Sequence, residues 1–250
     1  LFLRSKKGVQ LTENGKLMLP LLREVVRVHR NAEQFGAEIC GIVKGSLSIG
    51  CYYSVSALWM PKILTVFRAR YPGVTVRMQE GGNLEMARWL SERSVDCCFG
   101  AKPKSDVYDW LPVFRDELVA WLPQDHPLAD RPAFPLDALQ EEPFIYTSPN
   151  HDTDLDRLLA AHDLHPRTCF TTRDGFTTYN MVGAGLGVSF NQRLISRRWN
   201  GTVTEVPFDP PQFVTLGISV PSLKEASPAA RKFIDCAIET VSAEEHLKDR

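Results

Sequence analysis

No stretch of the sequence approaches the roughly 20 consecutive apolar residues that a membrane-spanning helix needs. The first ten residues, LFLRSKKGVQ, carry charges where a signal peptide needs its apolar segment. We therefore expect neither membrane insertion nor export, and we expect a cytoplasmic location.

The sequence also lacks motifs for metal binding, cofactor binding and catalysis. The six cysteines have no metal-site spacing and stand mostly among apolar neighbours, which is typical of reduced, cytosolic thiols. Gly183-x-Gly185-x-Gly187 precedes a predicted strand, whereas a dinucleotide-binding loop follows one. Because no Ser, His and acidic set converges either, we expect no metal, no cofactor and no enzymatic activity.

Charge is nearly balanced, at a formal net of −1, but it is unevenly distributed along the chain. Residues 1–44 hold eight basic and four acidic side chains, whereas the remainder holds 21 basic and 26 acidic ones. A basic arm on a mildly acidic domain favours a polyanion as the partner of the arm alone.

An apolar stripe is present over residues 18–39. Its members recur at alternating steps of three and four residues, the heptad spacing of a helix that packs against a partner helix. The positions between them are largely polar or charged, so we predict a homodimer or homotetramer assembled through this stripe. The predicted dimerisation residues are Met18, Leu21, Val25, Val28, Ala32, Phe35 and Ile39.

From Ser46 onward, predicted strands alternate with predicted helices, a pattern that favours βαβ units on a largely parallel sheet. The chain is long enough for two α/β lobes of about 90 residues each, and prolines 207, 210 and 211 are expected to break it near its end. The expected helices are 57–71, 83–92, 153–162, 176–183 and 228–242, and the expected strands are 47–50, 74–79, 94–99, 117–122, 143–147, 167–171, 186–190, 202–206 and 214–220.

Seven short motifs follow one another over nearly the whole chain. They are Leu1-Phe2-x-Arg4, Leu11-Thr12-x-x-Gly15, Gly45-x-Leu47-x-Ile49-Gly50, Phe67 with Tyr71-Pro72, Asp96, His126-Pro127-Leu128-Ala129 and Val182-x-x-Gly185-Leu186-Gly187-Val188. In this order they resemble the motifs of a LysR-type transcriptional regulator.

The resemblance implies an α/β fold with two Rossmann-like lobes of periplasmic-binding-protein type II architecture. A long dimerisation helix and the remnant of a winged helix-turn-helix would precede these lobes, and a small-molecule effector would bind between them. The expected division is a wing at 1–11, a linker helix at 12–44, lobe I at 45–119 with 214–250, and lobe II at 120–213.

The family's DNA-recognition helices would precede Leu1, so the resemblance implies promoter DNA as a partner that this chain does not read by itself. Residues 1–11 are predicted to form a hairpin with a basic turn. There Arg4, Lys6 and Lys7 suit contacts to the DNA phosphate backbone, although a solvated loop is the plain alternative.

Polar residues at the ends of predicted strands are expected to meet at the effector cleft, because strand ends of open α/β sheets line the ligand crevice. Ser54 and Ser56 stand at a strand-to-helix turn that suits an anion, and Ser54 falls where the family commonly places an effector-contacting hydroxyl. Helix capping alone is the alternative for these two serines. The remaining expected effector-binding residues are Asn83, Thr147, Ser148, Thr172, Arg173 and Phe190. Arg173 suits a carboxylate, with plain solvation as the alternative, and Phe190 suits a wall of the cleft, with a place in the core as the alternative.

Two alternatives follow from the same residues. Asp152-x-Asp154-x-Asp156 resembles a calcium loop but has Arg157 where that loop requires Gly, so we interpret it as the acidic start of a helix. A solute-binding protein shares the two-lobe fold. The charged N-terminus, the unpaired cysteines and the heptad stripe favour the regulator instead.

Overall fold

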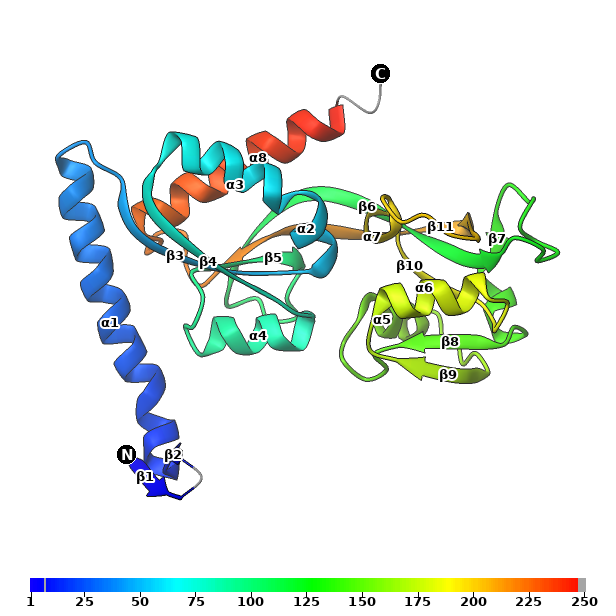
Figure 1. The fold of residues 1–250 in the computed structure, drawn as a ribbon, viewed down its shortest axis with the longest axis horizontal. Helices are drawn as coiled ribbons and strands as arrows, with labels where there is room; N and C mark the ends of the chain where they lie inside the picture. The colour runs from blue at the N-terminus through cyan, green and yellow to red at the C-terminus, as the bar shows by residue number, and fades with distance from the viewer. Residues whose placement is uncertain (7, 247–250) are drawn as a thin grey trace.

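The computed structural model describes residues 1–6 and 8–246. The chain begins with an antiparallel hairpin of β1 (Phe2–Ser5) and β2 (Gly8–Leu11), followed by the long helix α1 (Glu13–Ile39). Thr12 caps this helix, since its side chain accepts a hydrogen bond from the Gly15 N–H at 3.0 Å. Figure 1 shows α1 projecting from the rest of the molecule with the hairpin at its far end.

The linker helix is shorter than the predicted 12–44. It ends at Ile39, and Gly41 adopts a left-handed φ of +73° that turns the chain towards β3 (Lys44–Cys51). Glycine is favoured there because other residues are strained at positive φ.

The first α/β unit is built on three parallel strands, in agreement with the predicted βαβ pattern. β3 lies between β4 (Gly73–Glu80) and β5 (Cys97–Ala101). The helices α3 (Met60–Arg70) and α8 (Pro228–His246) pack together on one face, and α4 (Asn83–Ser91) covers the other (Figure 1). The single helix expected at 57–71 is two helices, because α2 (Tyr53–Leu58) ends before Trp59 and α3 begins just ahead of Pro61.

Two long antiparallel strands, β6 (Asp109–Pro123) and β11 (Val203–Val220), connect the two halves of the molecule. The predicted break at prolines 207, 210 and 211 is wrong. β11 is continuous, and these prolines fall at a register shift between Pro207 and Gln212. A proline lacks the N–H that a regular ladder requires, and an irregular stretch tolerates that loss.

The second α/β unit follows β6. It contains a short strand β7 (Phe134–Pro135), a 3-10 helix at Leu136–Gln140, and the parallel pair β8 (Phe144–Thr147) and β9 (Thr168–Thr172). The remaining elements are α5 (Asp154–Ala161), α6 (Gly175–Gly183), β10 (Ser189–Gln192), which pairs with β6, and α7 (Arg193–Ser196).

The buried apolar side chains form separate cores in the two halves. The first core contains Trp59, Phe67 and Phe233, whereas Phe134 and Phe144 belong to the core of the second half. We keep the names lobe I and lobe II for these two halves. Within residues 1–6 and 8–246, no helix combines the length and the apolar character that crossing a bilayer requires.

Candidate functional site

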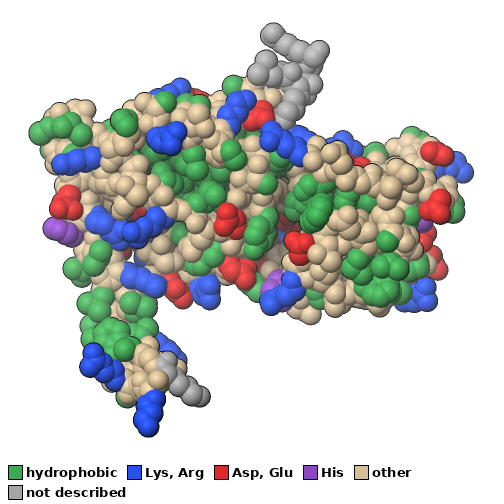
Figure 2. Space-filling model, in the orientation of Figure 1, with side chains coloured by type: hydrophobic (Ala, Val, Ile, Leu, Met, Phe, Trp, Pro, Cys, Tyr) green, Lys and Arg blue, Asp and Glu red, His purple; other side chains and the backbone are tan. Residues whose placement is uncertain are grey.

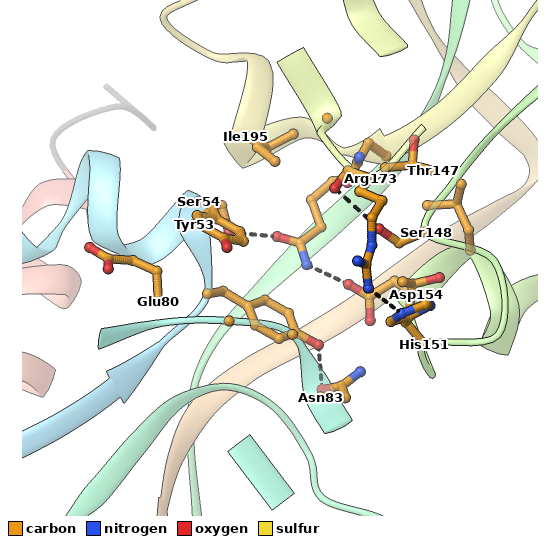
Figure 3. A pocket seen from close by; sticks show the side chains of 18 of the residues that line it. Tyr53, Ser54, Glu80, Asn83, Thr147, Ser148, His151, Asp154, Arg173 and Ile195 are labelled. Atoms are coloured by element: carbon orange, nitrogen blue, oxygen red, sulfur yellow. Dashed lines mark hydrogen bonds between the residues drawn. The ribbon is translucent and has the colours of Figure 1, made fainter. Parts of the chain in front are cut away.

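A cleft of about 480 Å³ lies where the two lobes meet. From lobe I it is lined by the start of α2, the turn after β4 and the start of α4; from lobe II, by residues that follow β8 and β9 and by the end of β10. Because parallel strands end at the same edge of a sheet, β3 and β4 deliver their following residues to one side of this cleft. Figure 3 shows the lining side chains from close by.

Ser54 joins the two sides of the cleft. Its side chain is buried and its hydroxyl donates a hydrogen bond to Gln192 Oε1 at 2.9 Å. Gln192 is the last residue of β10 and follows Ser54 by 138 positions in the sequence. The contact therefore depends on the arrangement of the lobes and not on any local motif.

Gln192 continues this connection to Asp154. Its side-chain Nε2 donates to Asp154 Oδ2 at 2.5 Å, and both side chains are buried. Burial raises the pKa of Asp154, and the hydrogen bond from Gln192 acts in the opposite direction. A polar network of Ser54, Gln192 and Asp154 thus spans the cleft.

A second polar connection runs from Tyr52 to lobe II. The Tyr52 hydroxyl donates to Asn83 Oδ1 at 2.5 Å, and Asn83 Nδ2 donates to the Asp152 carbonyl at 2.5 Å. Burial raises the pKa of Tyr52 well above its usual value, so its hydroxyl stays protonated as the donor. Asn83 therefore lines the cleft from the start of α4, the helix that follows β4.

Arg173 lies on the lobe II side of the cleft, beside His151 (Figure 3). Its guanidinium donates to His151 Nε2 at 2.9 Å, and His151 Nδ1 is 2.8 Å from the Pro149 carbonyl. The carbonyl only accepts, so the imidazole proton belongs on Nδ1 and Nε2 is the acceptor. Arg173 forms no ion pair with any acidic side chain of the described chain, which leaves its charge available to an anion.

Thr147 and Ser148 also line the cleft, as expected from the end of β8. The Thr147 hydroxyl lies 2.6 Å from that of Thr178, and the Ser148 hydroxyl donates to the Arg173 carbonyl at 3.1 Å. The second contact holds the backbone that carries the Arg173 guanidinium.

Three of the eight expected residues lie elsewhere. The Ser56 hydroxyl donates to Glu80 Oε1 at 2.9 Å, and the Thr172 side chain accepts from the Asp174 N–H at 3.2 Å; neither serves as a wall of the cleft. Phe190 is fully buried in the core of lobe II, with ring centroids 5.9 Å from Phe144 and 5.6 Å from Phe208. The prediction that Phe190 walls the cleft is therefore wrong.

Sequence reasoning missed Gln192 and assigned Asp154 only to the start of a helix. The helical assignment is confirmed, since Thr153 caps α5 and Asp154 and Asp156 occupy its first turn. Among the residues that the structure describes, no cluster of His, Cys, Asp or Glu has the geometry to hold a metal ion. Two acids of the former calcium-loop pattern bond within the protein instead, since Asp152 accepts from the Arg157 guanidinium and Asp156 accepts from the Thr153 N–H.

The stripe predicted on α1 is largely exposed. Apolar side chains follow the projecting helix, and Lys and Arg side chains surround the hairpin at its end (Figure 2). Phe35 differs from the other members of the stripe, since it is half-buried with the Arg231 guanidinium 5.0 Å above its ring. Arg4 and Lys6 are exposed on the hairpin, and Lys7 lies outside the described residues.

An exposed linker helix, two α/β lobes and a polar cleft between them define a ligand-sensing domain of the periplasmic-binding-protein type. The family model for the LysR substrate binding domain matches residues 41–242. The chain belongs to the LysR family of transcriptional regulators.

Individual relatives agree with this assignment. The HTH-type transcriptional regulator YvbU of Bacillus subtilis is 32% identical over 247 residues, which cover 96% of this chain and 82% of that protein. The structure of HinK, a LysR family transcriptional regulator from Pseudomonas aeruginosa, matches with a TM-score of 0.69 at 25% identity, over 93% of this chain and 81% of that one. The BenM effector binding domain with its effector benzoate shares the fold, with a TM-score of 0.68 at 22% identity over 80% of this chain and 93% of that one.

Proposed function

We propose that this regulator binds a small carboxylic acid between its lobes, with the carboxylate on Arg173. The observation that carries the proposal is a guanidinium that lines the cleft between the lobes and has no acidic partner in the described chain. Arginine suits this role because its planar fork donates two parallel hydrogen bonds to a carboxylate. BenM, whose effector benzoate is a carboxylate, supports the same chemistry.

Binding at the cleft would stabilise the closed arrangement of the lobes. Ser54 and Gln192 already join its two sides, so a ligand that contacts both sides adds to an existing connection. A ligand shifts a conformational equilibrium only by its difference in affinity for the two states. An effector that contacts both lobes binds the closed arrangement more tightly than an open one. Its binding would therefore couple the cleft to the arrangement of the DNA-binding segments.

We also propose that α1 pairs with a second copy of the chain, giving at least a homodimer. The exposed stripe supports this, because Leu21, Val25 and Val28 are each more than half exposed in the single chain. The hairpin, with Arg4 and Lys6, would lie beside the phosphate backbone of promoter DNA in the cytoplasm, and no catalytic step is needed in this scheme.

The proposal can be tested by thermal shift with benzoate and a panel of aliphatic carboxylic acids. A ligand at 100 times its dissociation constant stabilises the folded state by about 2.7 kcal/mol. We expect at least one acid to raise the melting temperature of the wild type and to lose this effect in Arg173→Met. Arg68→Met, at an exposed position of α3, is the matched control and should respond as the wild type does. A shift that survives Arg173→Met would place the acid elsewhere.

A further inference from the structure

Asp154 has a buried acceptor without a partner beside the cleft. The residue lines the cleft and is only 8% exposed, whereas the other acidic lining residues, Glu80 and Glu85, are more exposed. Within the described residues, Oδ2 accepts from Gln192 and Oδ1 has no hydrogen-bond partner. A buried acceptor without a donor is destabilising, so such an atom in a ligand cleft points to a donor supplied by the ligand.

The direction of the hydrogen bonds in this network explains why Oδ1 of Asp154 remains an acceptor without a donor. Ser54 donates to Gln192 Oε1, so the Gln192 amide nitrogen faces Asp154 and donates to Oδ2. Two other donors interact electrostatically with this carboxyl group, but both are already engaged. Tyr52 donates its hydroxyl proton to Asn83, and the Arg157 guanidinium donates to both oxygens of Asp152.

Arg173 provides the complementary group on the same side of the cleft. Figure 3 shows Asp154, His151 and Arg173 next to one another, and the Arg173 guanidinium donates to the neutral His151 ring. The cleft therefore offers a cation for an anionic group and, close by, a carboxyl oxygen for a donor.

We propose that the effector is a bifunctional acid, whose carboxylate binds Arg173 and whose ammonium or hydroxyl group donates to Asp154 Oδ1. This inference rests on the carboxylate site of the proposed function and narrows the ligand to amino acids and hydroxy acids. Asp154 then acts as a specificity-determining residue, because an acid without the donor leaves Oδ1 unsatisfied.

Matched sets of acids test this inference by calorimetry on the full chain. One set is phenylalanine, phenyllactate, phenylpyruvate and phenylpropionate; the other is 3-aminobutyrate, 3-hydroxybutyrate, acetoacetate and butyrate. Within a set, only the group near the carboxylate changes, from ammonium to hydroxyl, carbonyl or hydrogen. We expect the amino or hydroxy member of at least one set to bind about 10- to 150-fold more tightly than the unsubstituted acid. Whichever of the amino acid and the hydroxy acid binds more tightly then shows whether the donor group of the effector is an ammonium or a hydroxyl.

The variant Asp154→Asn inverts the chemistry at almost unchanged shape. Its amide oxygen can accept from Gln192, which directs the NH₂ group to the position of Oδ1 and replaces an acceptor by a donor. We expect this variant to lose the preference for the amino or hydroxy acid. We expect it to bind the oxo acid more tightly than the wild type does. Asp137→Asn makes the same carboxyl-to-amide change at an exposed position of lobe II away from the cleft and should keep the wild-type order.

Each other outcome overturns the inference in a recognisable way. If the wild type binds all members of each set of acids with equal affinity, the proposal of a donor subsite at Asp154 is wrong, whereas the proposed carboxylate site on Arg173 is unaffected. A wild type that prefers the oxo acid would show that Asp154 itself donates. Binding of no acid at all would overturn both this inference and the carboxylate site on Arg173. The wild-type comparisons need no variant, so they decide the matter even if Asp154→Asn folds poorly.

Discussion

The Ser54 hydroxyl and the Gln192 side chain are 2.9 Å apart, across the meeting point of two lobes. Their hydrogen bond satisfies two buried polar groups at once, and one lies at the start of α2 while the other ends β10. The geometry of the cleft is therefore sensitive to a single hydroxyl group.

Replacing Ser54 by alanine should weaken effector binding while the fold remains intact. The change removes a donor, leaves Gln192 Oε1 unsatisfied and loosens the contact between the lobes. We expect calorimetry with the acid that gives the largest thermal shift to report an affinity about 10- to 150-fold lower. Ser56→Ala is the matched control, since Ser56 does not line the cleft and its hydroxyl bonds only to the exposed Glu80 side chain, so its loss should leave the affinity unchanged. If Ser54→Ala binds the acid as tightly as Ser56→Ala does, Ser54 does not contribute to the ligand site.

Asp116 predicts a pH dependence of stability. It is 2% exposed and accepts from the Leu194 N–H at 3.0 Å. Burial raises the pKa of this carboxyl group to about 7, against the effect of that hydrogen bond. The folded state therefore holds a proton that the unfolded chain releases from about pH 4 upward, and stability falls as the pH rises towards 7.

We expect this group alone to lower the free energy of unfolding of the wild type by about 2 kcal/mol between pH 5.5 and pH 8. Asp116→Asn should abolish that part of the decline in urea titrations at the two pH values. Asp109→Asn, on the same strand and also bonded to a backbone N–H, is the control and should leave the decline in place. If Asp116→Asn and the wild type change in parallel, the decline has another source.

The exposed stripe of α1 predicts that charges at its centre prevent assembly. In Val25→Glu/Val28→Glu, two carboxylates per chain would enter a desolvated seam, at a cost of several kcal/mol. We expect light scattering to show a smaller species than the wild type. Asn14→Glu/His29→Glu adds acidic groups at exposed polar positions of the same helix and should assemble normally. Unchanged assembly of the valine variant would exclude the stripe as the interface.

The hairpin predicts weak DNA binding by this 250-residue chain, without sequence preference. Arg4 and Lys6 are exposed and suit phosphate contacts, which typically give dissociation constants of about 10⁻⁴ to 10⁻⁶ M at physiological salt. Arg4→Ala/Lys6→Ala should weaken binding in anisotropy titrations and reduce its salt dependence, whereas Arg68→Ala/Arg77→Ala on lobe I should not. Tight, sequence-selective binding would contradict the phosphate-contact interpretation.

The order of strands and helices was predictable because periodicity and turn residues are local. Local signals also explain why Ser54, Asn83 and Thr147 were expected at the cleft, since each stands at or just after a strand end. The continuity of β11 through its prolines was not predictable. It depends on pairing with β6, a strand about 80 residues earlier in the chain.

The errors at the site have a similar cause. Phe190 and Asn191 are neighbours on a strand and point to opposite faces, so only the tertiary packing decides which of them reaches the cleft. Asp154 carried the local signal of a helix start, and that signal was correct. Its second role appears only because folding brings Gln192 to one of its oxygens and leaves the other without a donor.

The antiparallel pairing of β6 and β11 makes lobe II an insertion into lobe I. The chain leaves lobe I at Glu117 and returns at Phe213, and these two residues face each other in register. Of the buried apolar residues in the core of lobe I, only Leu194 comes from the intervening segment. Joining the two strands there by a tight turn would thus yield a hairpin and a miniature domain that retains nearly its whole interior. Lobe II is thus inserted through two adjacent strands, and we expect a chain shortened at this point of the sheet to keep the core of lobe I.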